Sequence, residues 1–177
     1  TCDGFFFKDK KVFVVGGGDS AMEEAIFLTK FASSVTIIHR RDSFRASKIM
    51  QDKALNNDKI DVMWNSSVLD MIGEPEDGGL KSLLIENVLE NKTFEVDADG
   101  LFLGIGHTPN SEIFKDSINL DDKGYILTYN NSTETSKKGV FAAGDIMDPI
   151  YRQAITAAGS GCMAALDAER FLENLHI

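Results

Sequence analysis

The sequence predicts an α/β protein built on a parallel sheet. Short apolar runs alternate with stretches of helical spacing in the order strand, helix, strand, helix, strand over residues 11–64. A run of three glycines separates the first strand from the first helix. The 177 residues are 43% hydrophobic and 26% charged, which is ordinary for a folded domain with a sizeable core.

The elements of this first region follow one another closely. Residues 11–15 form a β-branched and aromatic run typical of a buried strand, and apolar side chains at helical spacing predict a helix at residues 20–32. The next strand, helix and strand are expected at residues 35–38, 47–55 and 62–64. With right-handed crossovers, this order produces parallel strands.

The middle of the chain changes character. An antiparallel insert is expected to contain strands at residues 80–87 and 92–98, and residues 74–79 are expected to form the turn that leads into it. Residues 101–105 are apolar and return to the main sheet, whereas residues 106–110 mark a candidate domain boundary. Two strands and a long helix are expected beyond it, at residues 125–128, 140–143 and 152–174.

Charge and cysteine content exclude several classes of function. The net charge of −10 argues against nonspecific binding to nucleic acid or anionic membranes, and no apolar run approaches the length of a membrane span. Two cysteines are too few for a disulfide framework, so a reducing, cytoplasmic location is expected. The chain opens with Thr1 and has no signal-peptide pattern, which indicates a processed N-terminus or a fragment.

The glycine-rich turn predicts a nucleotide site. Residues 16–21, GGGDSA, fit the pattern G-x-G-x-x-G/A between a strand and a helix. In this pattern Gly16 permits the tight turn, Gly18 lets the backbone approach a pyrophosphate, and Ala21 allows close packing of helix on sheet. The helix N-terminus favours anions. The alternative is a structural turn, and the candidate binding residues are Gly16, Gly18, Asp19, Ser20 and Ala21.

A basic cluster follows the second expected strand. His39, Arg40 and Arg41 end this strand, and Arg45 comes four residues later. An NAD-binding unit usually has an acidic residue here, which would repel a 2′-phosphate, whereas arginines offer charge and a planar fork of donors. The cluster therefore indicates NADP(H) rather than NAD(H). A solvated basic turn is the alternative interpretation.

The C-terminal part contains a weaker constellation. Asp145 follows a short apolar strand and could hold a ribityl or sugar hydroxyl, although taken alone such an aspartate is more often a turn or capping residue. Residues 151–154 open the long helix, whose N–H groups could face an electron-rich ring edge. Small residues are frequent at 154–165, which indicates helix packing, and Cys162 is expected to be inert.

Five segments in one order resemble the low-molecular-weight thioredoxin reductases of bacteria and plants. These are Cys2-Asp-Gly4, the GGGDSAMEEA segment from Gly16, HRRDSFR at 39–45, GIGHTPN at 104–110, and Gly144-Asp145 through Arg152-Gln-Ala154. The resemblance covers nearly the whole chain. It implies a homodimer whose FAD-binding domain is split in sequence by an inserted NADPH-binding domain.

The resemblance also implies how the chain divides. Residues 1–107 are expected to be a Rossmann-like, three-layer NADPH-binding domain with an antiparallel β insert, led by residues 1–10 with a redox cysteine. Residues 108–177 are expected to be the C-terminal portion of the split FAD-binding domain. In the family, electrons pass from NADPH to FAD, to a cysteine pair and to thioredoxin.

Site residues carried over by the resemblance fall into three groups. Cys2 is similar to the cysteine nearest the flavin, and Asp3 to the acid that protonates its thiolate. The 2′-phosphate clamp is implied at Arg40, Arg41 and Arg45, and His39, Ile105 and Gly106 are further cofactor-binding candidates. Flavin contacts are implied at Asp145, Arg152, Gln153 and Ala154.

The chain departs from the family pattern at its start. The first cysteine of the pair and the first part of the FAD domain would precede Thr1, so we expect binding of NADP(H) without turnover by this chain alone. A related ferredoxin–NADP reductase lacks the cysteine pair, and an alkyl hydroperoxide reductase flavoprotein subunit uses NADH; residues 2–4 and the arginines argue against each. A noncatalytic NADP-binding module is the alternative from another class.

Overall fold

A computed structural model describes residues 2–175 of the chain. The chain divides into two compact units, Thr1–Gly106 and His107–Ile177. We refer to them as unit 1 and unit 2 and describe each by itself.

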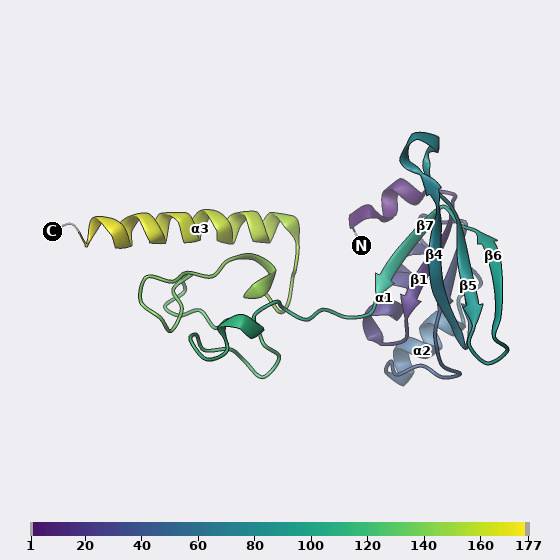
Figure 1. The fold of residues 1–177 in the computed structure, drawn as a ribbon, viewed down its shortest axis with the longest axis horizontal. Helices are drawn as coiled ribbons and strands as arrows, with labels where there is room; N and C mark the ends of the chain where they lie inside the picture. Colours follow the sequence, from purple (N-terminus) through teal and green to yellow (C-terminus); the bar gives the residue numbers. More distant parts are fainter. Residues whose placement is uncertain (1, 176–177) are drawn as a thin grey trace. The chain divides into compact units, whose positions relative to one another are not determined.

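The centre of unit 1 is a parallel sheet of four strands, as predicted (Figure 1). Its spatial order is β3-β2-β1-β7, and every neighbouring pair is parallel. The first three strands are separated in sequence by helices α1 (Asp19–Leu28) and α2 (Lys48–Leu55). The strands are β1 (Lys11–Gly16), β2 (Ser34–Ile38), β3 (Ile60–Met63) and β7 (Gly100–Gly104).

The two faces of the parallel sheet are covered differently. Val12 and Val14 of β1 point toward α1 and are fully buried with Met22 and Leu28. Phe13, between them in sequence, points to the opposite face and packs in a second cluster with Leu83. Because successive side chains of a strand alternate between faces, β1 joins two cores. The result is a layer of helices, a parallel sheet and a second sheet, which confirms the predicted α/β class.

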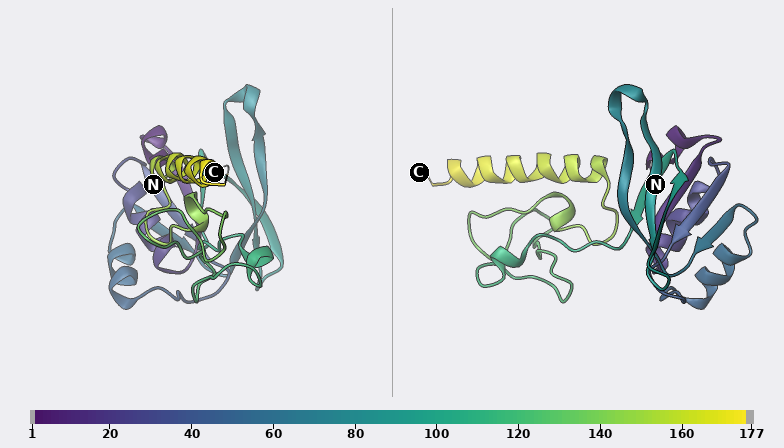
Figure 2. Two further views of the ribbon diagram at one scale, coloured as in Figure 1. Left: turned by 90° about the vertical axis from the view of Figure 1, so that its left-hand side faces the viewer. Right: turned by 45° about the vertical axis from the view of Figure 1, so that its right-hand side comes forward.

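The second sheet is antiparallel and has the order β4-β5-β6. Its strands are β4 (Ser66–Glu74), β5 (Gly79–Asn87) and β6 (Lys92–Asp97). The β4–β5 hairpin extends beyond the rest of unit 1 (Figure 2). Strand β4 is absent from the sequence prediction, and residues 74–79 close this hairpin instead of leading into the insert. Most of β4 is exposed, so it lacks the apolar alternation that identifies a strand.

Unit 2 contains one long helix, α3 (Ala154–Glu173), and two single-turn 3₁₀ helices, Glu112–Phe114 and Gly144–Ile146. The strands expected at 125–128 and 140–143 are wrong: the described residues there form only isolated bridges, Leu120 with Ile126 and Glu134 with Phe141. Their apolar side chains belong to a small core instead, and the Ile126 N–H donates to the Ile146 carbonyl. An apolar run without a neighbouring strand cannot form a ladder.

Helix α3 begins with a reciprocal cap. The Gln153 side chain accepts from the Thr156 backbone N–H, and the Thr156 hydroxyl accepts from the Gln153 backbone N–H. Further along, the Asp167 carboxylate accepts from the backbone N–H and hydroxyl of Thr133, which ties α3 to the loops. No residue of α3 is buried within unit 2. Among the described helices, none is long and apolar enough to cross a membrane.

Candidate functional site

Unit 1 has a cavity of about 790 Å³ at the carboxyl ends of β1, β2 and β7. This is the edge at which α/β sheets bind ligands. Nine residues predicted to bind cofactor line it: Gly16, Gly18, Ser20, His39, Arg40, Arg41, Arg45, Ile105 and Gly106. The fold thus brings together residues from three separate sequence motifs.

The glycine turn is built for close approach. A side chain at Gly16 would collide with the Gly104 carbonyl and lie 2.6 Å from Ala21 Cβ. At Gly18, by contrast, an added Cβ would meet nothing within 4 Å, so the backbone there is open to a ligand. Gly18 is the residue that precedes α1, and it has no side chain that could cap the helix. The first N–H groups of α1 therefore remain available to an anion.

The His39 ring packs against this turn at Gly17. It occupies the space that a side chain at Gly17 would need, and its Nε2 lies 3.0 Å from the Ser43 carbonyl oxygen. Only 8% of the residue is exposed, and the rings of Phe44 and Trp64 lie beside it. Burial lowers the pKa of His39 below its ordinary value, with smaller contributions from the neighbouring arginines in the same direction. The imidazole is therefore neutral near pH 7.

The arginine turn is fixed to the glycine turn through the backbone. The Arg45 N–H donates to the Gly17 carbonyl at 2.7 Å, and the Asn65 N–H donates to the Arg41 carbonyl at 3.2 Å. The side chains of Arg40, Arg41 and Arg45 are exposed, and none of them forms an ion pair with a described carboxylate. Three guanidinium groups at one cavity form a site for a multiply charged anion such as a phosphate monoester.

Two predicted binding residues have other roles. Asp19 lies outside the cavity lining, and its Oδ1 accepts hydrogen bonds of 2.8 Å from both the backbone N–H and the hydroxyl of Ser47. Ala21 is fully buried under Gly16 and Gly104. Both residues therefore support the cavity without lining it. Asp19 anchors the loop that follows Arg45, and the small side chain of Ala21 lets helix α1 pack close to the sheet.

The remaining candidates lie in unit 2 or at the N-terminus. Asp145 is half exposed, with Oδ2 3.7 Å from Nε2 of His107. Arg152 has a positive φ of 50° and donates its N–H to Asp148 Oδ2 at 2.9 Å, next to Gln153 and Ala154 at the start of α3. Backbone N–H groups of this turn donate hydrogen bonds to Asp148 and lower its pKa, and the bond from Tyr151 contributes most.

Comparison with known proteins places the chain in a family. The model of the pyridine nucleotide-disulphide oxidoreductases matches residues 1–161. The chain belongs to this family. It is 57% identical over 175 residues to a thioredoxin reductase of Streptomyces clavuligerus, covering 99% of this chain and 53% of that protein. With the mitochondrial thioredoxin reductase 1 of Arabidopsis thaliana it shares 54% over 177 residues, 99% of this chain and 47% of that one.

Solved structures of the family agree. The thioredoxin reductase of Streptococcus pyogenes superposes with a TM-score of 0.86 at 43% identity, covering 97% of this chain and 55% of that one. The resemblance deduced from the motifs is thereby confirmed. The chain spans about half the length of the curated relatives it matches.

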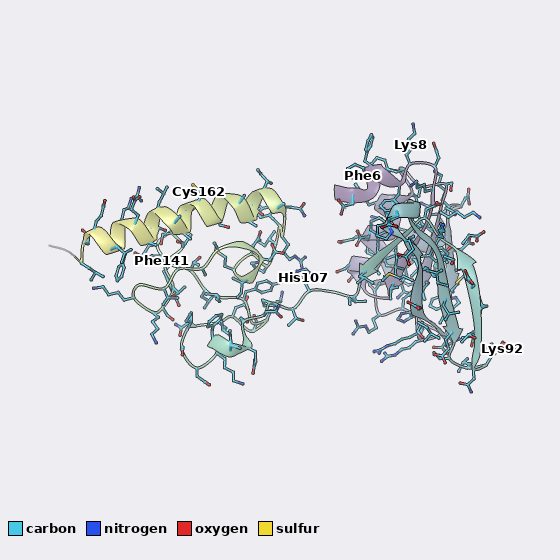
Figure 3. All side chains as sticks on the ribbon, turned by 45° about the horizontal axis from the view of Figure 1, so that its top comes forward. Phe6, Lys8, Lys92, His107, Phe141 and Cys162 are labelled. Atoms are coloured by element: carbon cyan, nitrogen blue, oxygen red, sulfur yellow. The ribbon has the colours of Figure 1, made fainter. Side chains whose placement is uncertain are left out.

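Within this family member, the N-terminal segment carries the redox candidates. Cys2 and Asp3 begin a 3₁₀ helix, Cys2–Phe7, in which Asp3 is exposed and Gly4 packs against Phe27 and Leu28. The side chain of Cys2 lies outside the described part of the structure. The other cysteine, Cys162, is a free thiol and is exposed on α3 (Figure 3), so the helix packing expected for residues 154–165 does not cover it within the described residues.

Sequence reasoning missed one wall of the cavity. Residues 66–71 of β4 line it, together with Leu101 and Leu103 of β7. Apolar side chains remain exposed there: Leu69, Met71 and Leu103 are 51%, 62% and 63% exposed. The sequence signal there is two apolar pairs, Val68-Leu69 and Met71-Ile72, on either side of Asp70, which is too weak to identify a binding surface without the fold.

Proposed function

We propose that the chain is the NADP(H)-binding part, joined to a portion of the FAD-binding part, of a thioredoxin-disulfide reductase. Unit 1 binds the dinucleotide and unit 2 contributes to the flavin site. The observation that carries this proposal is the joint presence of the open glycine turn and three unpaired arginines in one cavity. The identity to thioredoxin reductases supports the assignment to this activity.

Each part of the cavity matches a part of NADPH. The pyrophosphate lies at Gly18 and the N-terminus of α1, where N–H groups are free and the helix dipole favours anions. The 2′-phosphate is held by Arg40, Arg41 and Arg45. His39 is neutral and buried, so it positions this turn and adds no charge to the clamp. Asp70 on β4 is the only acidic residue among the described lining residues. It does not follow β2, where a carboxylate would select NAD(H).

Residues of unit 2 suit the edge of a flavin nucleotide. The Asp145 carboxylate is exposed and can accept hydrogen bonds from ribityl hydroxyls, while the turn before α3 presents backbone groups of Arg152, Gln153 and Ala154. FAD, when bound, supplies the two-electron chemistry that links the nicotinamide to a disulfide. These residues bind and orient it.

The N-terminal segment carries the disulfide chemistry in this proposal. Cys2 is the cysteine reduced by the flavin, and its partner cysteine lies outside this chain. Asp3, exposed beside it in the 3₁₀ helix, protonates the thiolate released when the disulfide opens. Thioredoxin is the disulfide substrate, and the intact protein is a homodimer.

A calorimetric titration of the chain with NADPH and NADH tests the nucleotide assignment. Each guanidinium–phosphate bond contributes about 1.5–3 kcal/mol, so NADPH should bind roughly 10- to 100-fold more tightly than NADH. Arg41→Glu should abolish the preference. Lys53→Glu, which reverses an exposed cation of α2 outside the cavity lining, should leave it unchanged.

Equal affinity for the two cofactors, or equal effects of the two substitutions, would show that the arginines do not bind a 2′-phosphate. The activity itself is tested by completing the chain with the part of its relatives that it does not cover and measuring NADPH-dependent reduction of thioredoxin. An assembled protein that holds FAD but leaves thioredoxin oxidised would contradict that part of the proposal.

A further inference from the structure

Strand β4 begins beside the arginine turn. The Asn65 N–H donates to the Arg41 carbonyl, and the Ser66 N–H donates to the His39 carbonyl at 3.0 Å. Because these bonds fix the start of β4 to the turn that carries the arginines, the strand continues the cavity wall from the cluster outward. Ser66 and Ser67 lie nearest to the turn in sequence, and the wall then becomes apolar at Val68.

A β-bulge shapes this wall. Val68 pairs with Ile85 and Asp70 pairs with Leu84, so Leu69 is an extra residue with no partner in β5. A bulge breaks the alternation of side chains, and here residues 68–71 all line the cavity. Leu69 and Met71 leave 51% and 62% of their surface exposed. Exposed apolar side chains on a cavity wall offer an apolar ligand a surface from which it can displace water.

The opposite sheet supplies matching surface. Leu103, near the end of β7, and Ile105, just after it, are 63% and 66% exposed and line the same cavity. Both are apolar, as are Leu69 and Met71, whereas the arginines belong to the turn that follows β2. The cavity therefore combines a cationic part with an apolar part, which suits a ligand that carries both a phosphate and an aromatic ring.

The chemistry of NADP(H), whose binding is proposed above and on which this step rests, identifies the ring. The 2′-phosphate is carried by the ribose of the adenosine half, and that ribose also carries adenine. The nicotinamide is attached to the other ribose, across the pyrophosphate. The ring nearest to the 2′-phosphate is therefore adenine, and β4 begins at the turn whose arginines would hold that phosphate.

We propose that Leu69 and Met71 of the β4 bulge form the apolar wall against which the adenine ring of NADP(H) packs. They are positioning residues for the cofactor: the arginines hold the 2′-phosphate, and the bulge orients the ring attached to the same ribose. Asp70, between them, directs Oδ1 to the Met71 N–H at 2.8 Å and so belongs to the strand's local structure.

The test compares ligands that share or lack adenine. NADPH, adenosine 2′,5′-bisphosphate and reduced nicotinamide mononucleotide are titrated calorimetrically into the chain and into Leu69→Ala/Met71→Ala. Both side chains are largely exposed, so the variant should fold, which thermal unfolding checks. Leu89→Ala, at a residue 72% exposed and outside the cavity lining, is the matched control.

The double variant should bind NADPH and adenosine 2′,5′-bisphosphate about tenfold more weakly, by the same factor, because both carry the ring. The control should leave both affinities unchanged. Weakening of NADPH alone would place the nicotinamide half at this wall and overturn the proposal, and so would unchanged affinity for both ligands. Failure of the unmodified chain to bind either ligand would instead refute the nucleotide site itself.

Discussion

At the scale of single residues, the candidate site depends on positions that lack a side chain as well as on particular side chains. A residue larger than glycine does not fit at position 17, because the His39 ring fills the space that its side chain would need. The Nε2 atom of this ring lies 3.0 Å from the Ser43 carbonyl oxygen. A histidine next to two arginines would normally be assigned to the phosphate. Its burial instead makes it a support for the turn, since a charged imidazole is disfavoured there.

The titration of His39 gives a prediction about pH. Its pKa in the folded protein lies below the value of about 6.5 in the unfolded chain. As the pH falls below about 6.5, the unfolded state takes up a proton before the folded state does, so stability is lost over this window as the pH decreases. We expect the NMR titration midpoint of His39 below 6.5, and a loss of unfolding free energy between pH 7 and 5.5 that His39→Gln reduces.

The carboxylates Asp148 and Asp167 also have lowered pKa values, but their contribution is lost only below about pH 4, the ordinary range of aspartate. The window above pH 5.5 therefore separates the contribution of His39 from those of these two aspartates. A His39 midpoint at or above 6.5 would contradict the prediction.

At the scale of elements, the cavity is held together by loops bonded to one another. The residues around Arg45 bond to Gly17 through their backbone and to Asp19 through Ser47. Asp19 stands at the start of α1, so one carboxylate fixes the first helix to the loop that leads into the second. Lys59 acts similarly at the other end of α1, where its Nζ donates to the Thr29 and Ala32 carbonyls. The backbone of the turn is therefore held in place by these hydrogen bonds.

Substitution of Asp19 separates anchoring from ligand contact. Asp19→Ala removes both hydrogen bonds to Ser47, so Arg45 should lose its fixed position and NADPH affinity should fall by about three- to tenfold, equivalent to about one hydrogen bond. Asp19→Asn retains the accepting oxygen and should bind like the unmodified chain. Calorimetric titration measures both. Equal weakening in the two variants would instead indicate that the carboxylate charge itself matters.

At the scale of the whole molecule, the two units are organised differently. Unit 1 has two apolar clusters on the two sides of its parallel sheet and contains all the described residues that line the cavity. Unit 2 has one small cluster, and α3 has no buried residue within the described chain. Helix α3 also exposes large apolar side chains, among them Ile155, Met163 and Leu172. Unit 1 thus has the features of an independently stable domain, and unit 2 has few of them.

Residues 1–106 alone should therefore fold and bind NADPH. Because no described residue beyond Gly106 lines the cavity, we expect an affinity within about twofold of that of the whole chain. Circular dichroism should show a cooperative thermal transition for this piece and a weaker one for residues 107–177. A piece 1–106 that folds but binds NADPH much more weakly would show that unit 2 contributes to the site.

The sequence by itself determined the parallel sheet and the glycine and arginine motifs at its edge. Residues 11–64 show the strand and helix periods directly, and the glycine and arginine turns are continuous segments whose spacing reflects local backbone geometry. The order of these motifs also identified the family. All of these features depend on residues that are close together in the chain.

Only the tertiary structure decided the rest, because the remaining roles depend on partners far away in the sequence. Strand β4 is exposed along most of its length, and its pairing with β5 and its place beside Arg41 make it a wall of the cavity. The apolar segments at 125–128 and 140–143 lack a neighbouring strand and form loops. Likewise, the carboxylate of Asp19 became an anchor only because Ser47, 28 residues away, folds onto it.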